Sequence, residues 1–307
     1  MWNPESMESF RRINTDQAIK EILNTGEIDH QPIDKFKSLE SYDSREIEDD
    51  KILVQEARER FENYEKRMAH DKRENLEKGK ERGEAMEIVL THLFDLWFET
   101  DQVEAKVQRT TEFDDIINGT DMVAEFKKDE EVEELAMAID ASLNIRAMEH
   151  KLEKCYEKMT GKEEDFKVKY FQSRFEDASG RYPEGPLEEI VSIVVGLGYK
   201  NADDLFESFG DYLSTKKKES VSAEIKLQRL STDPVSKIIL KQIELQVNFY
   251  LDHQEFLREG VIDKLEKINK IIEDISENKK DVVTDFMMDE DQALEEVRRF
   301  TNRVRGN

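Results

Sequence analysis

The chain has 307 residues, of which 37% are hydrophobic and 39% are charged, and its formal net charge at pH 7 is −25. Its 16 Phe, 8 Tyr and 2 Trp exclude a wholly disordered chain, and its single cysteine excludes an internal disulfide and a cysteine-based zinc site. The acidic balance excludes a dominant cationic surface for nucleic acid, although a local basic face or a bound metal could supply one. Because the sequence has neither an apolar run of ~20 residues nor a signal-peptide pattern, we expect a cytoplasmic protein without membrane contact.

The first 43 residues are polar, with only a weak helical pattern at 15–23. From about Ser44 the spacing predicts helix as far as about Phe98. Between 44 and 82, acids and bases are nearly balanced over a thin apolar stripe, which is typical of a solvent-exposed helical arm or a short coiled coil. Such a helix could join copies of the chain into a homo-oligomer. The next segment should enter a core, because apolar residues recur in it at helical spacing: Met86, Leu90, Leu93 and Trp97.

After Thr100 the pattern becomes extended. The segment KVQRTTEFDDIINGTDMVAEF places Asn118-Gly119 between two runs rich in Val, Thr, Phe and Ile, which predicts a hairpin because both residues tolerate positive φ. The run LAMAIDASL predicts a third strand of a meander. We expect a helix at 144–159, strands at 166–172 and 189–198, and helices at 202–213, 234–259, 261–276 and 290–303. Asp233 before Pro234 marks a helix start.

The elements follow the order α-βββ-α-β-β and then continue as helices. The sequence therefore predicts an α/β protein with a mixed sheet core, flanked by a long N-terminal helix and by C-terminal helices. The expected divisions are a polar segment at 1–43, a charged helical arm at 44–82, an α/β core at 83–215 and a helical region at 216–307.

Two acids fall where strand ends should meet. Asp121 follows the Asn-Gly turn, and Asp140 lies near the end of the third predicted strand. Antiparallel neighbours bring those ends side by side, so two carboxylates on the same face could share one divalent cation. We expect Mg²⁺ or Mn²⁺, because hard cations take oxygen ligands. Glu87, on the preceding helix, could complete the ligands or hold a metal-bound water, as hydrolysis of a phosphodiester requires.

These features resemble the PD-(D/E)XK, or restriction-endonuclease-like, nuclease superfamily. The segment GEAMEIVLTHL is similar to the Gly-x-x-x-Glu helix of its Holliday-junction-resolvase-like members, matching Gly83 and Glu87. GTDMVAEF resembles the strand with the first metal-binding Asp, and AIDAS resembles the acid-x-Lys strand, so the resemblance places these roles on Asp121 and Asp140. It covers residues 83–198, and it implies a restriction-endonuclease-like core, a magnesium-dependent nuclease activity and a DNA or RNA partner.

Ser142 stands where the family has its lysine. That lysine orients the attacking water and offsets charge in the transition state, and a hydroxyl has neither the positive charge nor the reach. Lys127 could replace it, because in an ideal strand it shares a face with Asp121. Lys106 could also approach from before the first strand. Otherwise Ser142 itself positions the water, or the site is inactive.

The sequence leaves the function open. The leading hypothesis is a metal-dependent phosphodiesterase or nuclease, active or degenerate, and the alternative is a non-catalytic acidic helical interaction or scaffold protein with a structural α/β core. Acids outnumber bases around the predicted site, which opposes nucleic-acid binding unless metal ions neutralise them, and residues 58–82 offer the densest supply of cations. A nucleic-acid mimic has no specific motif behind it. Further candidate ligands or supporting acids are Glu112, Asp114 and Asp115.

Overall fold

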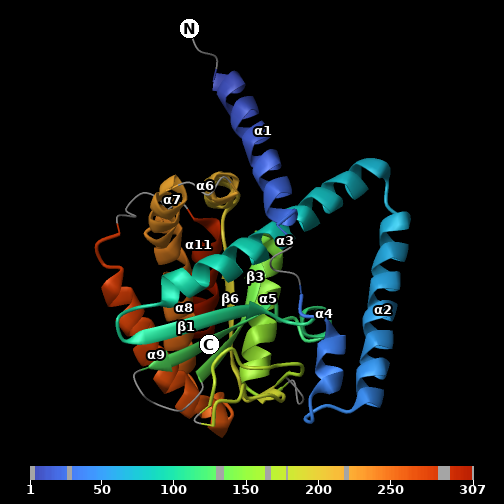
Figure 1. The fold of residues 1–307 in the computed structure, drawn as a ribbon, viewed down its shortest axis with the longest axis vertical. Coiled ribbons are helices and arrows are strands. Elements are labelled where there is room, and N and C mark those ends of the chain that lie inside the picture. Colours follow the sequence, from blue (N-terminus) through green and yellow to red (C-terminus); the bar gives the residue numbers. More distant parts are fainter. Residues whose placement is uncertain are drawn as a thin grey trace.

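The structure, a computed structural model, describes residues 4–25, 30–128, 135–162, 167–177, 179–217, 221–282 and 291–305. It is an α/β protein in which helices flank a four-stranded mixed sheet, as the sequence predicts (Figure 1). The helices are α1 (Pro4–Leu23), α2 (Ser44–Lys66), α3 (His70–Phe98), α4 (Glu112–Ile116), α5 (Ile145–Met159), α6 (Tyr199–Lys216), α7 (Val221–Ser231), α8 (Pro234–Asp252), α9 (Glu259–Asn278) and α11 (Gln292–Arg305), with short 3-10 turns η1 (Ile33–Ser38) and η2 (Gln254–Phe256). The strands are β1 (Val103–Arg109), β2 (Met122–Lys128), β3 (Leu135–Ser142), β4 (Lys167–Val168), β5 (Leu187–Glu188) and β6 (Val191–Gly196).

The main sheet has the strand order β1-β2-β3-β6. Strands β1, β2 and β3 form the predicted antiparallel meander, and β6 runs parallel to β3 after the chain crosses over through α5. Met122 and Phe126 of β2 pack against α3, where the rings of Phe98 and Phe126 lie 5.6 Å apart. The alternate residues Val123 and Ala138 lie on the opposite face. Because alternation divides each strand between two faces, residues 121 and 140 share this second face.

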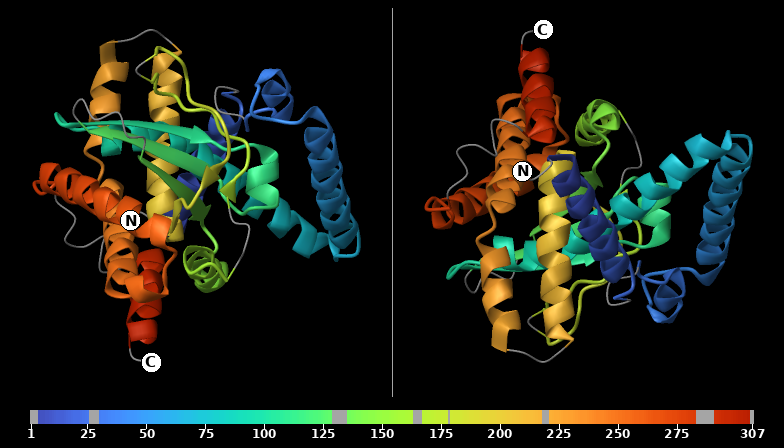
Figure 2. Two further views of the ribbon diagram at one scale, coloured as in Figure 1. Left: turned by 90° about the horizontal axis from the view of Figure 1, so that it is seen from below. Right: turned by 90° about the horizontal axis from the view of Figure 1, so that it is seen from above.

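The predicted continuous helix from 44 to 98 is wrong, because the chain turns at 67–69 and forms α2 and α3 (Figures 1 and 2). Contacts across the turn hold the two helices together: the Lys80 ammonium lies 3.9 Å from the centre of the Phe61 ring and 2.5 Å from Glu65. A thin apolar stripe packs better against a neighbouring helix than along a straight, solvated one. Helix α3 then continues into the core, so residue 82 lies within a helix and not between two elements.

The connection from β1 to β2 also differs from the predicted hairpin. The two strands pair as expected, but α4 lies between them, capped by the Thr111 side chain. Asn118 and Gly119 end this helical turn, and Gly119 has a φ of +61°. The Asn-Gly pair thus forms a turn with positive φ at Gly119, as predicted. The helix before it begins at Thr111, a helix-capping residue type that the hairpin prediction did not use.

The predicted strand at 166–172 contributes only β4, which pairs with β5 in a separate two-stranded sheet. Tertiary contacts explain the difference, because the buried carboxylate of Asp114 accepts the backbone N–H groups of Lys169 and Tyr170 at 2.7 and 3.0 Å. Those groups are therefore unavailable to a sheet ladder. The strand predicted at 189–198 is present as β6 and completes the main sheet.

Helices complete the core after β6. The Asp233 side chain caps α8 by accepting the Val235 N–H at 2.9 Å, as predicted, whereas α7 had no expected counterpart. The side-chain amides of Gln242 and Gln246 of α8 bind backbone N–H and C=O groups at the edge of β6, as a neighbouring strand would. At the opposite end of the chain, α1 begins at Pro4 and projects from the body, while its last turns pack against α6 and α3 (Figure 1).

Candidate functional site

Asp121 and Asp140 lie opposite one another at one end of the sheet. Met122 of β2 is in register with Ile139 of β3, and Asp121, the residue before β2, donates its N–H to the Ile139 carbonyl at 3.0 Å. Strand alternation turns both carboxyl groups to the same face. Asp121 is buried, and its Oδ2 accepts the Ala141 N–H at 2.6 Å. The structure therefore brings the two predicted acids together.

Lys151 of α5 brings a positive charge to this pair. Its Nζ donates to the Asp140 carboxylate and, at 2.9 Å, to the Ala141 carbonyl. The acid-x-Lys pattern could not identify it, because Lys151 follows Asp140 by 11 residues and belongs to the crossover helix. One signal was present in the sequence: Lys151 adjoins the apolar stripe of Met148 and Leu152, so it lies at the border of the face that α5 buries.

The pKa values of both Asp121 and Lys151 are raised above their ordinary values. Burial raises the pKa of Asp121 well above its ordinary value, and the nearby carboxylates of Asp140 and Glu87 raise it further. Burial also disfavours the charged form of Lys151, but Asp140 and Asp121 outweigh that effect and raise the pKa of Lys151. The cluster thus combines a protonated amine with a buried carboxyl, that of Asp121, whose ionised form is disfavoured.

Glu87 occupies the same end of the sheet, paired with Arg109. Its Oε2 accepts a hydrogen bond from Arg109 Nη2 at 2.5 Å, and the Arg109 side chain is only 2% exposed. Burial raises the pKa of Glu87 to about 7, against the effect of Arg109 and together with that of Asp115. Gly83, matched by the resemblance, has open space where a Cβ would lie, so packing does not require glycine there. Sequence reasoning missed Arg109, whose only signal is a charge at an inward position of β1.

The acids of α4 serve different purposes. Asp115 lies 3.4 Å from His30 Nε2, and burial followed by the charge of Arg109 lowers the pKa of His30. Asp114 is fully buried and organises the segment after α5 through the backbone bonds described above. Glu112 forms an ion pair with Arg58 of α2. Of these three candidate ligands, Asp115 is the one whose charge contributes clearly to the raised pKa of Asp121.

The two lysines expected to replace the family's lysine lie elsewhere. Lys127 is in register with Glu104 at the far end of β2. At the ~3.3 Å rise of a strand, it is about 20 Å from Asp121. Lys106 donates to the carbonyl of residue 174 at 3.1 Å. The expectation that either one joins the site is therefore corrected by the structure, which places Lys151 there.

Ser142 shares a face with Asp140, two residues along β3, and is buried. Its hydroxyl donates to the Asn144 carbonyl at 3.3 Å, in the turn that leads into α5. The hydroxyl therefore belongs to a turn and not to the contact between Lys151 and Asp140.

The donor set fits a hard cation in its chemistry. Asp121 and Asp140 present only oxygen, which suits Mg²⁺ or Mn²⁺, and Mg²⁺ sites commonly use one or two carboxylates together with water and substrate phosphate. In the part of the chain that the structure describes, no three His, Cys, Asp or Glu side chains are arranged to hold a metal ion. With Glu87 committed to Arg109, the protein would therefore contribute the two aspartates.

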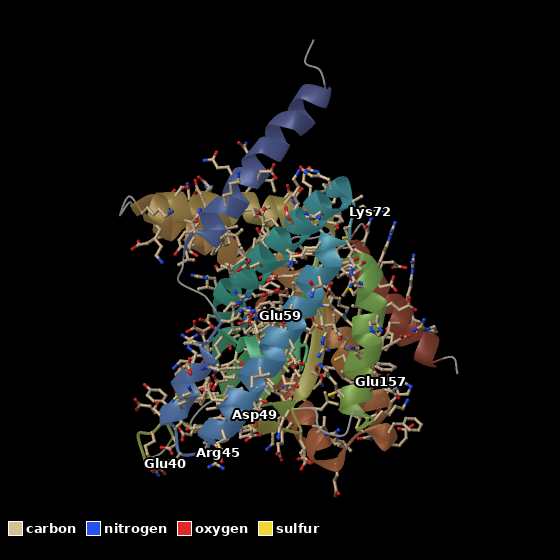
Figure 3. The ribbon with its side chains drawn as sticks, turned by 90° about the vertical axis from the view of Figure 1, so that its right-hand side faces the viewer. Glu40, Arg45, Asp49, Glu59, Lys72 and Glu157 are labelled. Atoms are coloured by element: carbon tan, nitrogen blue, oxygen red, sulfur yellow. The ribbon has the colours of Figure 1, made fainter. Side chains whose placement is uncertain are left out.

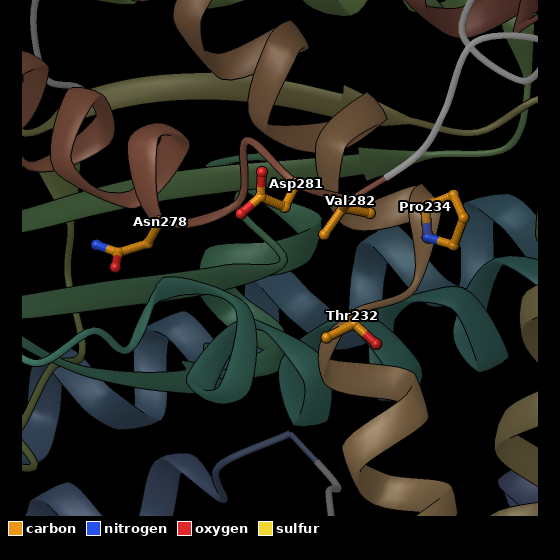
Figure 4. Close-up of a pocket in the computed structure, with 5 residues that line it drawn as sticks. All are labelled: Thr232, Pro234, Asn278, Asp281 and Val282. Carbon is orange, nitrogen blue, oxygen red and sulfur yellow. The ribbon is translucent and has the colours of Figure 1, made fainter.

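The cavity between α8 and the end of α9 offers less chemistry than this cluster. This cavity of about 380 Å³ is lined by Thr232, Pro234, Asn278, Asp281 and Val282, of which only one residue is titratable (Figure 4). None of the described helices combines the length and apolarity that crossing a bilayer requires. No family model, curated protein or solved structure matches this chain.

Proposed function

We propose that this chain is a divalent-metal-dependent phosphodiesterase of the restriction-endonuclease-like type that acts on nucleic acid. The observation that carries the proposal is the contact of Lys151 with Asp140 and the Ala141 carbonyl. It supplies, from α5, the positive charge that Ser142 cannot give at the position of the family's lysine. An ammonium beside an acid pair can stabilise the negative charge that develops on the phosphoryl oxygens in the transition state of phosphodiester hydrolysis.

The topology supports the same proposal. A helix carrying Glu87 packs on one face of an antiparallel meander, and a crossover helix leads to a fourth strand parallel to the third. Apart from the inserted α4 and the short strands β4 and β5, this is the α-βββ-α-β order that the resemblance implied. Because one fold hosts many activities, the argument for function rests on the residues at the sheet end and not on the topology.

Asp121 and Asp140 would hold the metal. When bound, it would supply a coordinated water of lowered pKa and neutralise charge on the phosphate. The raised pKa of Lys151 keeps its amine protonated at neutral pH, so it can donate to a phosphoryl oxygen or orient a water. The buried Arg109 side chain holds the Glu87 carboxylate at the same end of the sheet as Asp121 and Asp140.

The test combines cleavage with thermal stability. Labelled single-stranded and duplex DNA and RNA are incubated with the protein and Mg²⁺ or Mn²⁺, and the thermal midpoint is measured with and without Mn²⁺. We expect metal-dependent cleavage that Asp140→Asn and Lys151→Ala abolish and Lys151→Arg partly retains. Lys270→Ala, an exposed lysine of α9, serves as the matched control and should cleave normally.

Two outcomes contradict the proposal in different ways. Stabilisation by Mn²⁺ that Asp121→Asn removes, without any cleavage, would mean a metal-binding but inactive descendant. A folded protein that responds to neither metal nor nucleic acid would contradict both the metal site and the activity.

A second candidate function, a non-catalytic interaction or scaffold protein, is favoured by the surface of α2. This helix stands apart from the sheet (Figure 2) and carries charged side chains such as Arg45, Asp49 and Glu59 (Figure 3). It also carries exposed apolar side chains. Ile52 is 56% exposed and Tyr64 is 58% exposed. Concentration-dependent association, measured by light scattering and lost in Ile52→Ser/Tyr64→Ser, would support this role, whereas a monomer at all concentrations would oppose self-association through α2.

A further inference from the structure

Most cations of the α2–α3 arm already have carboxylate partners. Lysines and arginines are most frequent there, but each one with a described ion pair is matched by a nearby carboxylate of the protein. The pairs are Arg58–Glu112, Arg60–Glu56, Lys66–Glu62, Lys78–Glu74, Lys80–Glu65 and Arg82–Asp203. A phosphate that approached these side chains would compete with existing carboxylates. These paired cations therefore make the arm a weaker polyanion-binding surface than its composition indicates, and Arg45, Arg67, Lys72 and Arg73 are its cations without a carboxylate partner among the described residues.

Helix α5 has a different distribution of charge. Its acids Glu149 and Glu153 face α11, where both pair with Arg303. Lys151 turns inward to Asp140. The charges of this helix are thus sorted by face, with carboxylates toward α11 and one ammonium toward the acid pair.

The exposed edge of α5 carries Arg146, His150 and Lys154 at intervals of four residues. Residues four apart on a helix are neighbours on its surface, so these three side chains form one ridge. All three are exposed, and among the described residues no carboxylate oxygen lies within 4.0 Å of their side-chain nitrogens. Glu157 follows near the C-terminal end of the helix, beyond this ridge (Figure 3).

The ridge and the candidate site lie on neighbouring sides of α5. At a rise of ~1.5 Å per residue it spans about 12 Å along α5. Lys151 lies within this span, one residue after His150, and contacts Asp140. A polyanion bound along the ridge would therefore lie against the same helix that carries Lys151 to Asp140.

We propose that the ridge of Arg146, His150 and Lys154 binds the phosphate backbone of the nucleic-acid substrate and guides it to Asp121 and Asp140. This inference rests on the proposed function and specifies its substrate contact. Arg146 and Lys154 bind phosphates electrostatically and independently of base sequence, and the His150 ring can donate a hydrogen bond to a phosphate between them. Lys151 is bound to Asp140, so it contributes to cleavage. The ridge contributes the affinity for the phosphate backbone.

The experiment measures binding separately from cleavage. Fluorescence anisotropy with labelled single-stranded and duplex oligonucleotides, in Ca²⁺ and over a range of salt concentrations, compares wild type with Arg146→Gln/Lys154→Gln. We expect at least a tenfold loss of affinity and a salt dependence whose log–log slope falls by about 2, one unit per lost phosphate contact. The control Arg229→Gln/Lys270→Gln removes the same charge from exposed positions of α7 and α9 and should keep the wild-type slope. Circular dichroism and thermal melts confirm that both variants are folded.

Each outcome decides one of the two proposals. Equal binding by the ridge variant and its control would overturn the ridge, even if the wild type cleaves in Mg²⁺ and the proposed function stands. Ridge-dependent binding without cleavage in Mg²⁺ or Mn²⁺ would uphold the ridge and contradict the activity. Failure of the folded wild type to bind any oligonucleotide would overturn the ridge outright.

Discussion

Asp121 and Asp140 face one another across the ends of β2 and β3, and the Lys151 ammonium is the one cation of the described residues that contacts the pair. Asp121 is only 5% exposed, and its raised pKa means that ionising it works against the folded state. Such an arrangement is expected where a group is positioned for function at the expense of stability.

Replacing Asp121 with Asn should therefore stabilise the metal-free protein. Because the pKa of the native carboxyl is raised above the unfolded value, its favourable contribution is present at low pH and is lost as pH rises through the native pKa. The neutral amide can still accept the Ala141 N–H, so the gain in thermal midpoint should grow from pH 4 to pH 8. Thermal melts across this range test the prediction. A lower midpoint for Asp121→Asn at pH 8 would contradict it.

Glu87 should give the free energy of unfolding a second pH dependence. Its pKa is raised from 4.5 to about 7, so its contribution to stability is complete below pH 4.5 and is lost as pH rises through about 7. Glu87→Gln should remove this slope, because the neutral amide can still accept a hydrogen bond from Arg109 but does not titrate. Urea denaturation at several pH values between 4 and 8 measures the slope, and Glu84→Gln, an exposed neighbour on α3, should retain it.

The Gln246 side chain should stabilise the edge of the sheet at β6. Its side-chain amide donates to the Val194 carbonyl at 2.7 Å and accepts the Val194 N–H at 3.0 Å. Gln246→Leu leaves both buried backbone groups without these bonds, at a cost of about 2–4 kcal/mol. Denaturant unfolding should show this loss, whereas Gln292→Leu, exposed at the start of α11, should change stability little. An equal effect of both substitutions would mean that Gln246 does not act through its bonds to β6.

The base of α2 depends on one buried carboxylate. Asp50 accepts the Tyr170 hydroxyl at 2.6 Å and the Lys169 ammonium at 2.5 Å. Tyr170→Phe removes a hydrogen bond to a charged group, worth about 1.5–3 kcal/mol. Hydrogen exchange followed by mass spectrometry should show faster exchange in α2 and unchanged protection in β2 and β3. Tyr64→Phe, on an exposed side of the same helix, is the control, and unchanged exchange of α2 in Tyr170→Phe would show that the arm is held by other contacts.

The sequence by itself determined the elements whose information is local. The meander, the crossover helix, the buried strand β6 and the Asp233 cap all follow from hydrophobic period and from capping chemistry. The juxtaposition of Asp121 and Asp140 could be anticipated for the same reason, because antiparallel register is set by neighbouring strands.

Only the tertiary structure decided the features that depend on distant partners. Asp114 removes the backbone donors of the segment after β4 from any ladder, Lys80 holds α3 against α2, and the crossover carries Lys151 to Asp140. A strand pattern or a spacing rule cannot report these contacts, because each one joins side chains whose separation is set by the path of the chain in space and not by helical or strand period. The site's cation belongs to this second group, which is why the sequence placed the acids and left the lysine open.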